Sequence, residues 1–495
     1  MKLQELADLL LTSRVTHQAE IEISGIQTDS RKVQAGDLFI CLVGYQTDGH
    51  LYAEQAIQAG AVALLTEREL EVEVPQLIVS DSRFAMARVA NHFYQYPSQK
   101  LKLIGVTGTN GKTTITYLLD QILSDQQKQT GIMGTIQMKI GNETVEAKNT
   151  TQEALELQQN LKRMLDAGCE YGVMEVSSHA LELGRVKGCH FKTAIFTNLT
   201  QDHLDFHETM EQYRAAKSLL FSRLGNAYAT TASEQQFAVL NADDPASRDF
   251  AKVTAAQVLT YGIDQPADVR ATQIRMTQEG TTFSLESFAG NRTFTLKLMG
   301  KFSVYNALAA ITAALAEGID LDAIHRSLQS IAGVNGRFEA VQEGQDFLVI
   351  VDYAHTPDSL ENVLKTIQEL AEGRIITVFG CGGDRDRGKR PIMGEMAGTY
   401  SDYVWITSDN PRTEDPGRIL TDIEPGVQKA GLSRQQYEIE PDRKQAIEKA
   451  IHMATAGDVI LIAGKGHETY QEIHGVRHDF DDRLVAKEAI RRLVH

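Results

Sequence analysis

The strongest candidates for chemistry lie in one glycine-rich segment, which consists of Gly108, Thr109, Asn110, Gly111, Lys112, Thr113 and Thr114. Glycine lets backbone N–H groups converge on anionic oxygens, and a helix that begins here would add positive potential from its N-terminus. Lys112 could reach terminal phosphates, and the Thr113 hydroxyl could ligate Mg²⁺. The longer form of this motif has glycine six residues before the lysine, where this chain has Val106. We therefore predict nucleoside triphosphate binding through the shorter form, with an ordinary glycine-rich turn as the alternative.

Two polar segments follow apolar runs that we interpret as buried parallel strands. Glu175 ends the run 171–176, and His203 lies in the polar stretch that follows the run 193–199. Because the carboxyl ends of parallel strands meet at one edge of a sheet, both should lie near the glycine-rich segment, which follows the run 101–106. Oxygen ligands there favour Mg²⁺, and zinc is not needed to explain the spacing. A polar strand end that faces solvent is the alternative for Glu175.

Four polar loops follow predicted strands in the last third of the chain, at residues 352–357, 380–390, 408–416 and 464–468. They are dense in Arg, Asp, Glu and His. An arginine fork suits bidentate binding of a carboxylate or phosphate, and acidic neighbours suit an amine. In open α/β sheets, ligands bind at the carboxyl ends of strands. The loops therefore predict a ligand that carries both carboxylate and ammonium groups, and an amino acid fits.

The composition is that of an ordinary globular protein of more than one domain. The chain has 495 residues, and its 49 basic and 66 acidic residues give a net charge of −17, which argues against nucleic-acid or anionic-membrane binding. No apolar run is long enough for a membrane span, and the N-terminus lacks a secretory segment. The four cysteines form no C-x-x-C pair, which fits reduced thiols in the cytoplasm.

The alternation of apolar runs with helical patterns predicts an α/β protein of three domains. Residues 1–97 form a small α/β domain, residues 98–332 a central P-loop ATPase domain with a parallel sheet, and residues 333–495 a Rossmann-like, doubly wound domain. An antiparallel flap is predicted within 281–298 and an Ala-rich helix over 303–317.

Lys217 and the segment 28–31 indicate a function only weakly when each is considered alone. Lys217 lies among small residues in a predicted helix over 213–221, a pattern typical of a solvated surface lysine. The segment 28–31 groups hydroxyls with a cation, which could hold a sugar or phosphate, although such residues are also ordinary turn formers.

The motifs, in this order, resemble those of the Mur ligases, the ATP-dependent amide-bond-forming enzymes of peptidoglycan precursor synthesis. The segments that carry the resemblance are 108–114, 175–179, 305–307 and 352–357. The resemblance spans essentially the whole chain in the family's three-domain order. Segments 28–31 and 409–412 are similar to those of members that attach meso-2,6-diaminopimelate to UDP-N-acetylmuramoyl-L-alanyl-D-glutamate, the UDP-MurNAc-dipeptide.

The resemblance implies an ATP-dependent ligase. ATP would phosphorylate the D-glutamate side-chain carboxylate, the amine of the amino acid would attack the acyl phosphate, and ADP and phosphate would be released. In the family, the lysine that matches Lys217 is carbamylated, which turns a cation into an anionic ligand for Mg²⁺ and reverses the surface interpretation. The implied catalytic residues are Lys112, Lys217, His203 and Glu175, and the implied metal ligands are Thr113, Glu175, Lys217 and His203.

The resemblance also implies which residues bind the three substrates. Asn306, Arg337, Tyr353 and His355 would bind ATP together with the glycine-rich segment. Ser30 would contact the uridine end of the nucleotide sugar, and Thr150, Thr151, Ser177 and Arg185 would hold the muramoyl-dipeptide and its phosphates. The amino-acid pocket would contain Arg385, Asp409, Asn410, Pro411, Arg412, Gly464 and Glu468. Leu183 stands where some relatives have glutamine, so no polar contact is predicted from that side chain.

Arg412 decides the choice of amino acid. Diaminopimelate carries a distal carboxylate that lysine lacks, and an arginine fork complements it, while Glu468 suits the distal ammonium. Three alternatives stay open: the same reaction with L-lysine, a folylpolyglutamate synthetase, and a P-loop switch that uses nucleotide state to control a partner. We expect a cytoplasmic monomer that neither inserts into membranes nor binds nucleic acid.

Overall fold

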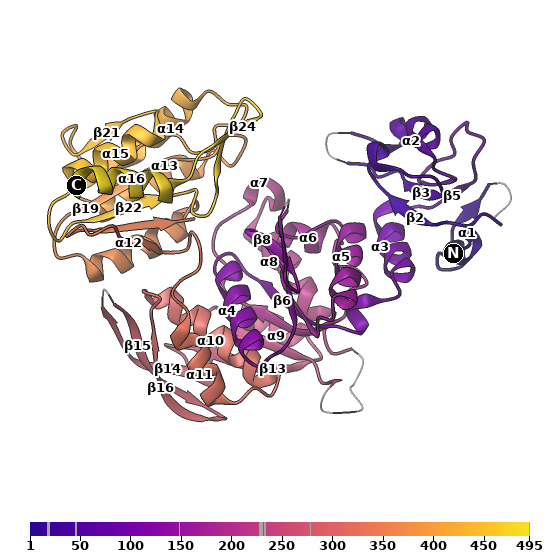
Figure 1. Cartoon of the computed structure of the whole chain (residues 1–495), viewed down its shortest axis with the longest axis horizontal. Helices are drawn as coiled ribbons and strands as arrows, with labels where there is room; N and C mark the ends of the chain where they lie inside the picture. The colour runs from indigo at the N-terminus through magenta and orange to yellow at the C-terminus, as the bar shows by residue number, and fades with distance from the viewer. Residues whose placement is uncertain are drawn as a thin grey trace.

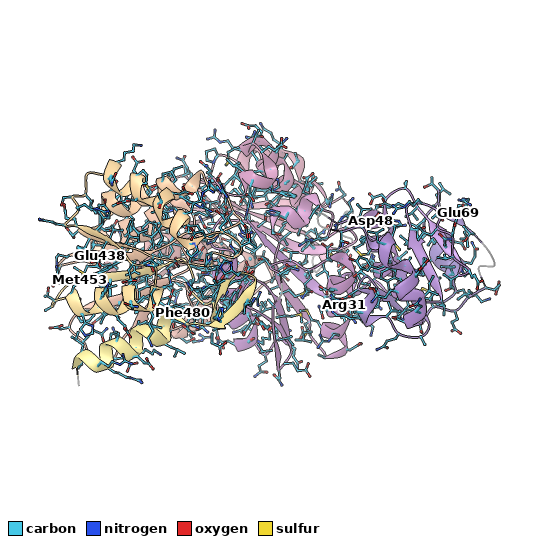
Figure 2. All side chains as sticks on the ribbon, turned by 90° about the horizontal axis from the view of Figure 1, so that it is seen from above. Arg31, Asp48, Glu69, Glu438, Met453 and Phe480 are labelled. Carbon is cyan, nitrogen blue, oxygen red and sulfur yellow. The ribbon has the colours of Figure 1, made fainter. Side chains whose placement is uncertain are left out.

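Three β-sheets, one for each domain, organise the protein (Figure 1). The computed structural model describes residues 1–16, 20–44, 47–147, 149–226, 231, 234–277 and 279–494. The N-terminal and C-terminal domains lie at opposite ends of the molecule, with the central domain between them (Figures 1 and 2). The predicted α/β class with three domains is confirmed. Within the described ranges, no helix has both the length and the apolar character needed to cross a membrane.

The N-terminal domain is built on a five-stranded sheet of order β1-β5-β4-β3-β2, in which β1 is antiparallel to β5 and the other strands pair in parallel. Its strands are β1 (Arg14–Val15), β2 (Gly25–Gln27), β3 (Asp37–Ile40), β4 (Ala63–Thr66) and β5 (Gln76–Ile78). Its helices are α1 (Leu3–Ala7), α2 (Ala53–Ala59) and α3 (Ser82–Phe93).

The central domain contains an eleven-stranded sheet of order β16-β15-β14-β13-β12-β11-β6-β10-β7-β8-β9. Its strands are β6 (Lys102–Thr107), β7 (Thr130–Met133), β8 (Gln137–Ile140), β9 (Glu143–Glu146), β10 (Tyr171–Glu175), β11 (Phe191–Phe196), β12 (Phe237–Asn241), β13 (Gln257–Gly262), β14 (Val269–Thr277), β15 (Gly280–Ser287) and β16 (Gly290–Leu296). Its helices are α4 (Lys112–Asp125), α5 (Ala154–Asp166), α6 (Ser178–Glu182), α7 (Leu204–His207), α8 (Met210–Ser222), α9 (Ser247–Val253), α10 (Lys301–Ala316) and α11 (Leu321–Ser330).

The position of β6 fixes where the glycine-rich segment lies. β6 is parallel to both of its neighbours, β10 and β11, so the segments that follow these three strands emerge at the same sheet edge. The predicted meeting of the polar segments after the three strands is therefore confirmed. At one end of the sheet, β14, β15 and β16 pair antiparallel, so the predicted flap is present and also includes β14, which the sequence did not indicate.

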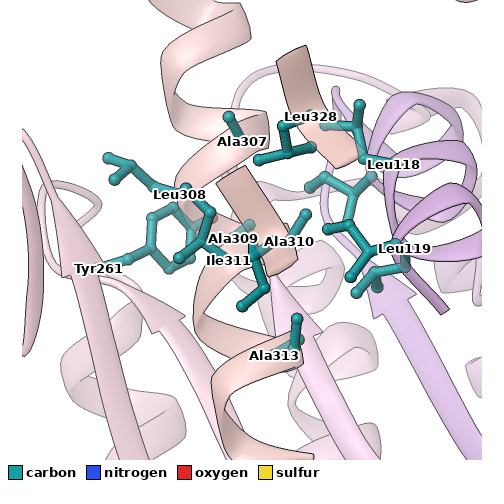
Figure 3. Close-up of a cluster of buried hydrophobic side chains, with 14 of the residues drawn as sticks. Leu118, Leu119, Tyr261, Ala307, Leu308, Ala309, Ala310, Ile311, Ala313 and Leu328 are labelled. Carbon is teal, nitrogen blue, oxygen red and sulfur yellow. The ribbon is translucent and has the colours of Figure 1, made fainter. Parts of the chain in front are cut away.

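The main core of the central domain lies where α10 packs against α4 (Figure 3). The run Ala307–Ala314 is buried, and the small alanine side chains let α10 approach Leu118 and Leu119 of α4. Tyr261 of β13 and Leu328 of α11 complete the cluster that Figure 3 shows. The predicted helix over 303–317 is confirmed within two residues.

The C-terminal domain contains a six-stranded sheet of order β17-β18-β22-β19-β20-β21, parallel except for β17. Its strands are β17 (Glu339–Val341), β18 (Leu348–Asp352), β19 (Ile375–Phe379), β20 (Tyr403–Ile406), β21 (Tyr437–Ile439) and β22 (Val459–Ala463), and β23 (Tyr470–Ile473) and β24 (Val476–Asp479) form a separate hairpin. Its helices are α12 (Pro357–Leu370), α13 (Lys389–Tyr400), α14 (Pro416–Lys429), α15 (Arg443–Met453) and α16 (Asp482–Val494).

The junction after the N-terminal domain is packed rather than loose. Residues Pro97–Gln99 form a short 3₁₀ turn, with Pro97 and Ser98 buried, and α3 packs along α5 of the central domain. Arg83 of α3 forms an ion pair with Glu153 at 3.1 Å. The predicted boundaries after residues 97 and 332 fall between sheets, and their exact positions stay a prediction.

One buried ion pair ties the C-terminal domain together at its loop-bearing edge. Arg443 donates to both carboxylate oxygens of Asp482, at 2.7 Å each, and both side chains are completely buried. The same guanidinium also donates to the carbonyl of Ala463, the last residue of β22, and to the carbonyl of Ser408, which follows β20. The pair therefore holds the ends of two strands against the start of α16.

We predict that Arg443→Met lowers the free energy of unfolding of the C-terminal domain by about 3–5 kcal/mol, because Asp482 would stay buried without its partner. Trp405 of β20 is the chain's single tryptophan, so urea unfolding followed by its fluorescence reports on this domain. The control is Arg492→Met, which removes an exposed ion pair and should change stability by less than about 1 kcal/mol. Equal urea midpoints for Arg443→Met and Arg492→Met would contradict a stabilising role of the buried ion pair.

Candidate active site

The glycine-rich segment joins β6 to α4 at the middle of the central sheet. Gly108 and Gly111 have φ angles of 144° and 89°, and a side chain at either position would collide with Thr197 or Asn306. Both positions therefore require glycine. The turn leads into the N-terminus of α4, whose first residue is Lys112. The predicted strand, turn and helix are present, and their geometry suits phosphate binding.

Two lysine amines converge on this turn. Lys112 Nζ donates to the carbonyls of Gly108 and Thr109 at 2.9 and 2.7 Å, and Lys217 Nζ donates to the same Gly108 carbonyl at 3.0 Å. Lys217 is only 1% exposed, so the surface position that its helix alone predicts is wrong. Burial lowers the pKa of Lys217 well below its usual value, and the charge of Lys112 lowers it further. Burial also lowers the pKa of Lys112.

Glu175 forms the centre of an oxygen-rich cluster beside α4. Its carboxylate accepts hydrogen bonds from the Thr113 hydroxyl at 3.0 Å and from the backbone and hydroxyl of Thr135 at 2.8 and 3.0 Å. Arg337, from the far side of the domain junction, donates to the Thr113 hydroxyl at 3.0 Å. The buried Nε of Arg337 has no hydrogen-bond partner in the described chain, which fits a guanidinium that awaits an anion. Thr135 was not predicted.

His203 lies at the entrance to α7, with a left-handed backbone at φ 55°. Its ring forms an edge contact with the His179 ring and pairs with Asp202 at 3.2 Å. Burial holds the pKa of His203 below its usual value despite Asp202, so the ring is neutral at pH 7 and its nitrogen can act as a ligand.

The residues present fit Mg²⁺ only in part. Thr113 and Glu175 offer the hydroxyl and carboxylate oxygens that Mg²⁺ prefers. The unmodified amine of Lys217 is a hydrogen-bond donor toward Gly108, so it would become an oxygen ligand only as a carbamate. Among the described residues, no three His, Cys, Asp or Glu side chains are arranged as a metal site. The structure thus brings together two of the four predicted ligands, with His203 and Lys217 sharing the Tyr213 ring as a neighbour.

The four residues predicted for the muramoyl-dipeptide lie together next to Glu175. Thr150 contacts Thr135 through their hydroxyls at 3.1 Å. The Thr151 hydroxyl donates to the Glu175 carbonyl at 2.9 Å and accepts from the Ser177 backbone at 3.0 Å, while Arg185 donates to the Thr151 carbonyl at 3.0 Å. The buried Nε of Arg185 finds no partner within the described ranges.

The residues predicted for the nucleotide come from two domains. Asn306 of α10 lies against Gly111. In the C-terminal domain, the Arg337 guanidinium stacks 4.5 Å from the Tyr353 ring centre, and the rings of His355 and His467 pack against the same tyrosine. Burial lowers the pKa of His355 to about 4. His467 was not predicted as part of this group.

Asp358 links the two domains directly and was also not predicted. One of its carboxylate oxygens accepts hydrogen bonds from the Asn110 side chain at 2.8 Å and from the Thr200 hydroxyl at 3.0 Å. Asp358 follows Pro357 in the first turn of α12, directly after the motif that carried the resemblance. An acidic residue at a helix N-terminus is so often an ordinary charge–dipole feature that Asp358 does not stand out among the other polar residues.

Arg385 and Arg412 lie on adjacent loops at the carboxyl edge of the C-terminal sheet. A side chain at Gly382 would touch both, at 2.8 Å from Arg412 Nη1 and 3.8 Å from Arg385 Cγ. The loops are held together because Arg412 donates to the Gly383 carbonyl at 2.8 Å and Asp384 accepts from the Thr413 hydroxyl. The nearest acid to Arg412 in the described chain is Glu472, 4.0 Å away. Burial lowers the pKa of Arg385 and the charge of Arg412 lowers it further, so the two guanidiniums lie close enough to interact and together suit an anion.

A compact polar cluster adjoins the arginines. Asn410 donates to Glu468 at 2.8 Å, and both side chains contact Lys465, whose ammonium is completely buried. Burial would raise the pKa of Asp409, but Lys465 and Arg443 hold it below its usual value. Gly464 has a φ of 117°, and a side chain there would collide with Asp409. Lys465 was missed, although its place between two glycines is a signal that could have identified it.

Of the predicted residues, Ser30 and Pro411 have yet to be placed in the structure. Ser30 lies in the N-terminal domain, where its hydroxyl donates to Gln55 at 3.1 Å, so it belongs to a different domain from the glycine-rich segment. Figure 2 labels its neighbour Arg31 in that domain. Pro411 contributes its backbone, since its carbonyl fills the space that a side chain at Gly383 would need.

Comparison with known proteins identifies the family of the chain. Models of three Mur ligase domains match the chain in order: the Mur ligase family catalytic domain over residues 22–99, the middle domain over 106–314 and the glutamate ligase domain over 336–466. A MurF ligase from Thermotoga maritima, solved in complex with ADP, has the same fold at 20% identity, with a TM-score of 0.64 and coverage of 96% of this chain and 97% of its own.

Closer relatives share a single name, UDP-N-acetylmuramoyl-L-alanyl-D-glutamate–2,6-diaminopimelate ligase. The relative from Halalkalibacterium halodurans is 54% identical over 491 residues, which are 99% of each chain, and that from Bacillus cereus is 52% identical over 490 residues, 99% of this chain and 98% of its own. A solved structure with this name is 37% identical, with a TM-score of 0.70 over 100% of this chain and 99% of its own. The chain therefore belongs to the Mur ligase family of ATP-dependent, amide-bond-forming ligases.

Proposed function

We propose that this chain joins meso-2,6-diaminopimelate to the D-glutamate side-chain carboxylate of UDP-N-acetylmuramoyl-L-alanyl-D-glutamate, with ATP converted to ADP and phosphate. Relatives that are more than 50% identical along almost the whole chain carry the name of this ligase. The observation that carries the proposal is the pair of guanidiniums, Arg385 and Arg412, at the edge of the C-terminal sheet. They suit the distal carboxylate that distinguishes diaminopimelate from lysine.

ATP would bind between the central and C-terminal domains. The turn that contains Gly108 and Gly111 would receive the phosphates, with Lys112 and the unpartnered Nε of Arg337 beside them. Asn306, Tyr353 and His355 would contact the rest of the nucleotide. Mg²⁺, when bound, would neutralise phosphate charge, held by Thr113 and Glu175 and, as we further propose, by His203 and carbamylated Lys217.

The reaction would proceed in two steps. First, the D-glutamate carboxylate attacks the terminal phosphorus of ATP, the bond from that phosphorus to the bridging oxygen breaks, and an acyl phosphate and ADP form. Second, the neutral amine attacks the acyl carbon and phosphate leaves from the tetrahedral intermediate with the bonding electron pair. The proton that the nitrogen loses as the amide forms is carried away on the phosphate. The protein mainly positions the reactants and neutralises charge. Thr150, Thr151, Ser177 and Arg185 would hold the muramoyl-dipeptide, with the uridine end reaching Ser30.

The amino acid would bind in the C-terminal domain. Arg412 and Arg385 would take its distal carboxylate, and the Asn410 amide would add a donor. Glu468 and Asp409 would take the distal ammonium, with the backbone of Gly464 and Pro411 closing the pocket. We further propose that the enzyme works as a cytoplasmic monomer in peptidoglycan precursor synthesis, and so supports cell shape and division.

The decisive assay measures ADP release from ATP and Mg²⁺ in the presence of the UDP-MurNAc-dipeptide and one amino acid at a time. Release that requires diaminopimelate supports the proposal. Release with L-lysine instead would favour the lysine-adding reaction, and hydrolysis without any amino acid would favour a P-loop switch. Activity only with a folate and glutamate would favour a folylpolyglutamate synthetase, whose reaction leaves the N-terminal domain unexplained.

We predict that Arg412→Ala lowers kcat/KM for diaminopimelate by about tenfold to hundredfold, the amount expected for the loss of a hydrogen bond to a charged group. ATP affinity should not change, because the guanidinium lies in the amino-acid pocket. Arg434→Ala, which removes an exposed arginine of the same domain, should behave like the unaltered chain. Unchanged kinetics with diaminopimelate in Arg412→Ala would refute the assignment of this residue.

We also predict that Lys217 takes up CO₂. Its lowered pKa leaves more of the amine neutral and reactive at pH 8 than in a surface lysine, and acidification through that lowered pKa protonates the amine and removes the carbamate. With ¹³C-bicarbonate, the carbamate signal in NMR spectra should be present in the unaltered protein and in Lys429→Met, an exposed control, and absent from inactive Lys217→Met. An active protein without the signal would contradict the prediction.

A further inference from the structure

We propose that Lys465 is a positioning residue for the amino-acid substrate, acting through Asn410 and Glu468, which rests on the proposed function. Its ammonium is completely buried and donates to the Asn410 side-chain carbonyl at 3.0 Å and to Glu468 Oε2 at 2.9 Å. Glycines with positive φ on either side, at Gly464 and Gly466, allow the tight turn that directs the lysine inward.

The first role of Lys465 is to orient Asn410. The carbonyl oxygen of this amide accepts from the lysine and from the Glu472 backbone N–H at 2.9 Å, so its NH₂ group is the end that faces Glu468. An amide without these partners could turn over and present an acceptor where the substrate carboxylate requires a donor. The lysine and the Glu472 backbone N–H thus together fix which end of Asn410 the ligand meets.

The second role concerns charge. Glu468 shares the pocket with Asp409, and the nearby Arg443 is already neutralised by Asp482. Arg412 also acts on Asp409, but we have assigned its charge to the distal carboxylate of the substrate. Two carboxylates and one ammonium leave the cluster with one net negative charge, which matches one ammonium group of the substrate. Without Lys465, the two carboxylates would repel each other and one would take up a proton.

The sign of the pH effect follows from the groups that face Glu468. These are Asp409 after β20, Lys465 on its own loop, Arg443 of α15, Tyr353 after β18 and Tyr470 of β23. Burial and Asp409 raise the pKa of Glu468, and Lys465 opposes them. Removing the lysine therefore moves the acid limb of the kcat/KM profile for diaminopimelate to higher pH.

The test compares diaminopimelate-dependent ADP release by the full chain and four variants: Lys465→Met, Glu468→Gln, the double variant, and exposed Lys429→Met as the control. We expect Lys465→Met to raise KM for diaminopimelate at least about tenfold, as for the loss of a buried charge contact, with KM for ATP and the UDP-MurNAc-dipeptide within about twofold. Because the lysine acts through Glu468, the double variant should be no worse than the more impaired single variant.

Three results would overturn the proposal: an unchanged KM for diaminopimelate, an equal rise in all three KM values, or additive losses in the double variant. If Lys465→Met does not fold by Trp405 fluorescence, Lys465→Gln, which keeps a donor without the charge, takes its place under the same criteria. An unaltered chain that shows no diaminopimelate-dependent ADP release would overturn the proposed function and this role together. An active chain with an unimpaired variant would overturn only the role of Lys465.

Discussion

Two lysine side chains that share the carbonyl oxygen of Gly108 set the chemistry of the whole site. Lys112 and Lys217 come from different helices, and both point into the turn after β6. Burying like charges side by side is unfavourable, so the arrangement is stable only with neutralisation, a bound anion, or conversion of one amine into an anion. A triphosphate would be the bound anion, and carbamylation of Lys217 would convert one amine into an anion. The binding site and the modification that we propose thus follow from one electrostatic constraint.

The position of this constraint explains the layout of the three domains. The turn lies at the end of the central strand β6, where residues after β10 and β11 converge with it. The C-terminal domain brings Arg337 and Asp358 to the same place, while its own sheet edge presents Arg385 and Arg412. In the function that we propose, a long substrate with its uridine end near Ser30 would place its reacting carboxylate between the phosphate donor and the amine.

Much of the fold followed from the sequence because it depends on local patterns. The apolar runs that became β6, β10 and β18, and the helix that begins at Pro357, are recognised by composition and by turn residues. The sequence also grouped Glu175 with the glycine-rich segment, since parallel strands share an edge. Strand β14 escaped prediction because only Val269 and Ala271 of its residues are buried, so it lacks the continuous apolar run by which the other strands were recognised.

The site was less predictable where a residue's meaning depends on distant contacts. Lys217 has the pattern of a surface lysine, and only packing against Tyr213 and Gly108 makes it buried. Asp358 and Lys465 look like an ordinary acidic residue of a first helical turn and an ordinary charged loop residue. Their contacts with Asn110 and Asn410, each more than fifty residues away in sequence, give them another meaning. Side-chain direction and burial are tertiary properties, and no local pattern encodes them.

The contacts between the central and C-terminal domains at the site are polar, and this has a consequence for water. Asn110, Thr200 and Thr113 reach Asp358 and Arg337 through hydrogen bonds. Each such bond joins a neutral group to a charged one, so exchanging it with water costs about 1.5–3 kcal/mol. Asn110, Thr200 and Arg337 act as donors in these bonds, and a phosphate would accept from donors of this kind. The domain contact and the nucleotide would therefore compete for the same donors. The polar groups at this domain contact hydrogen-bond to one another, and a ligand would take the place of these partners when it binds.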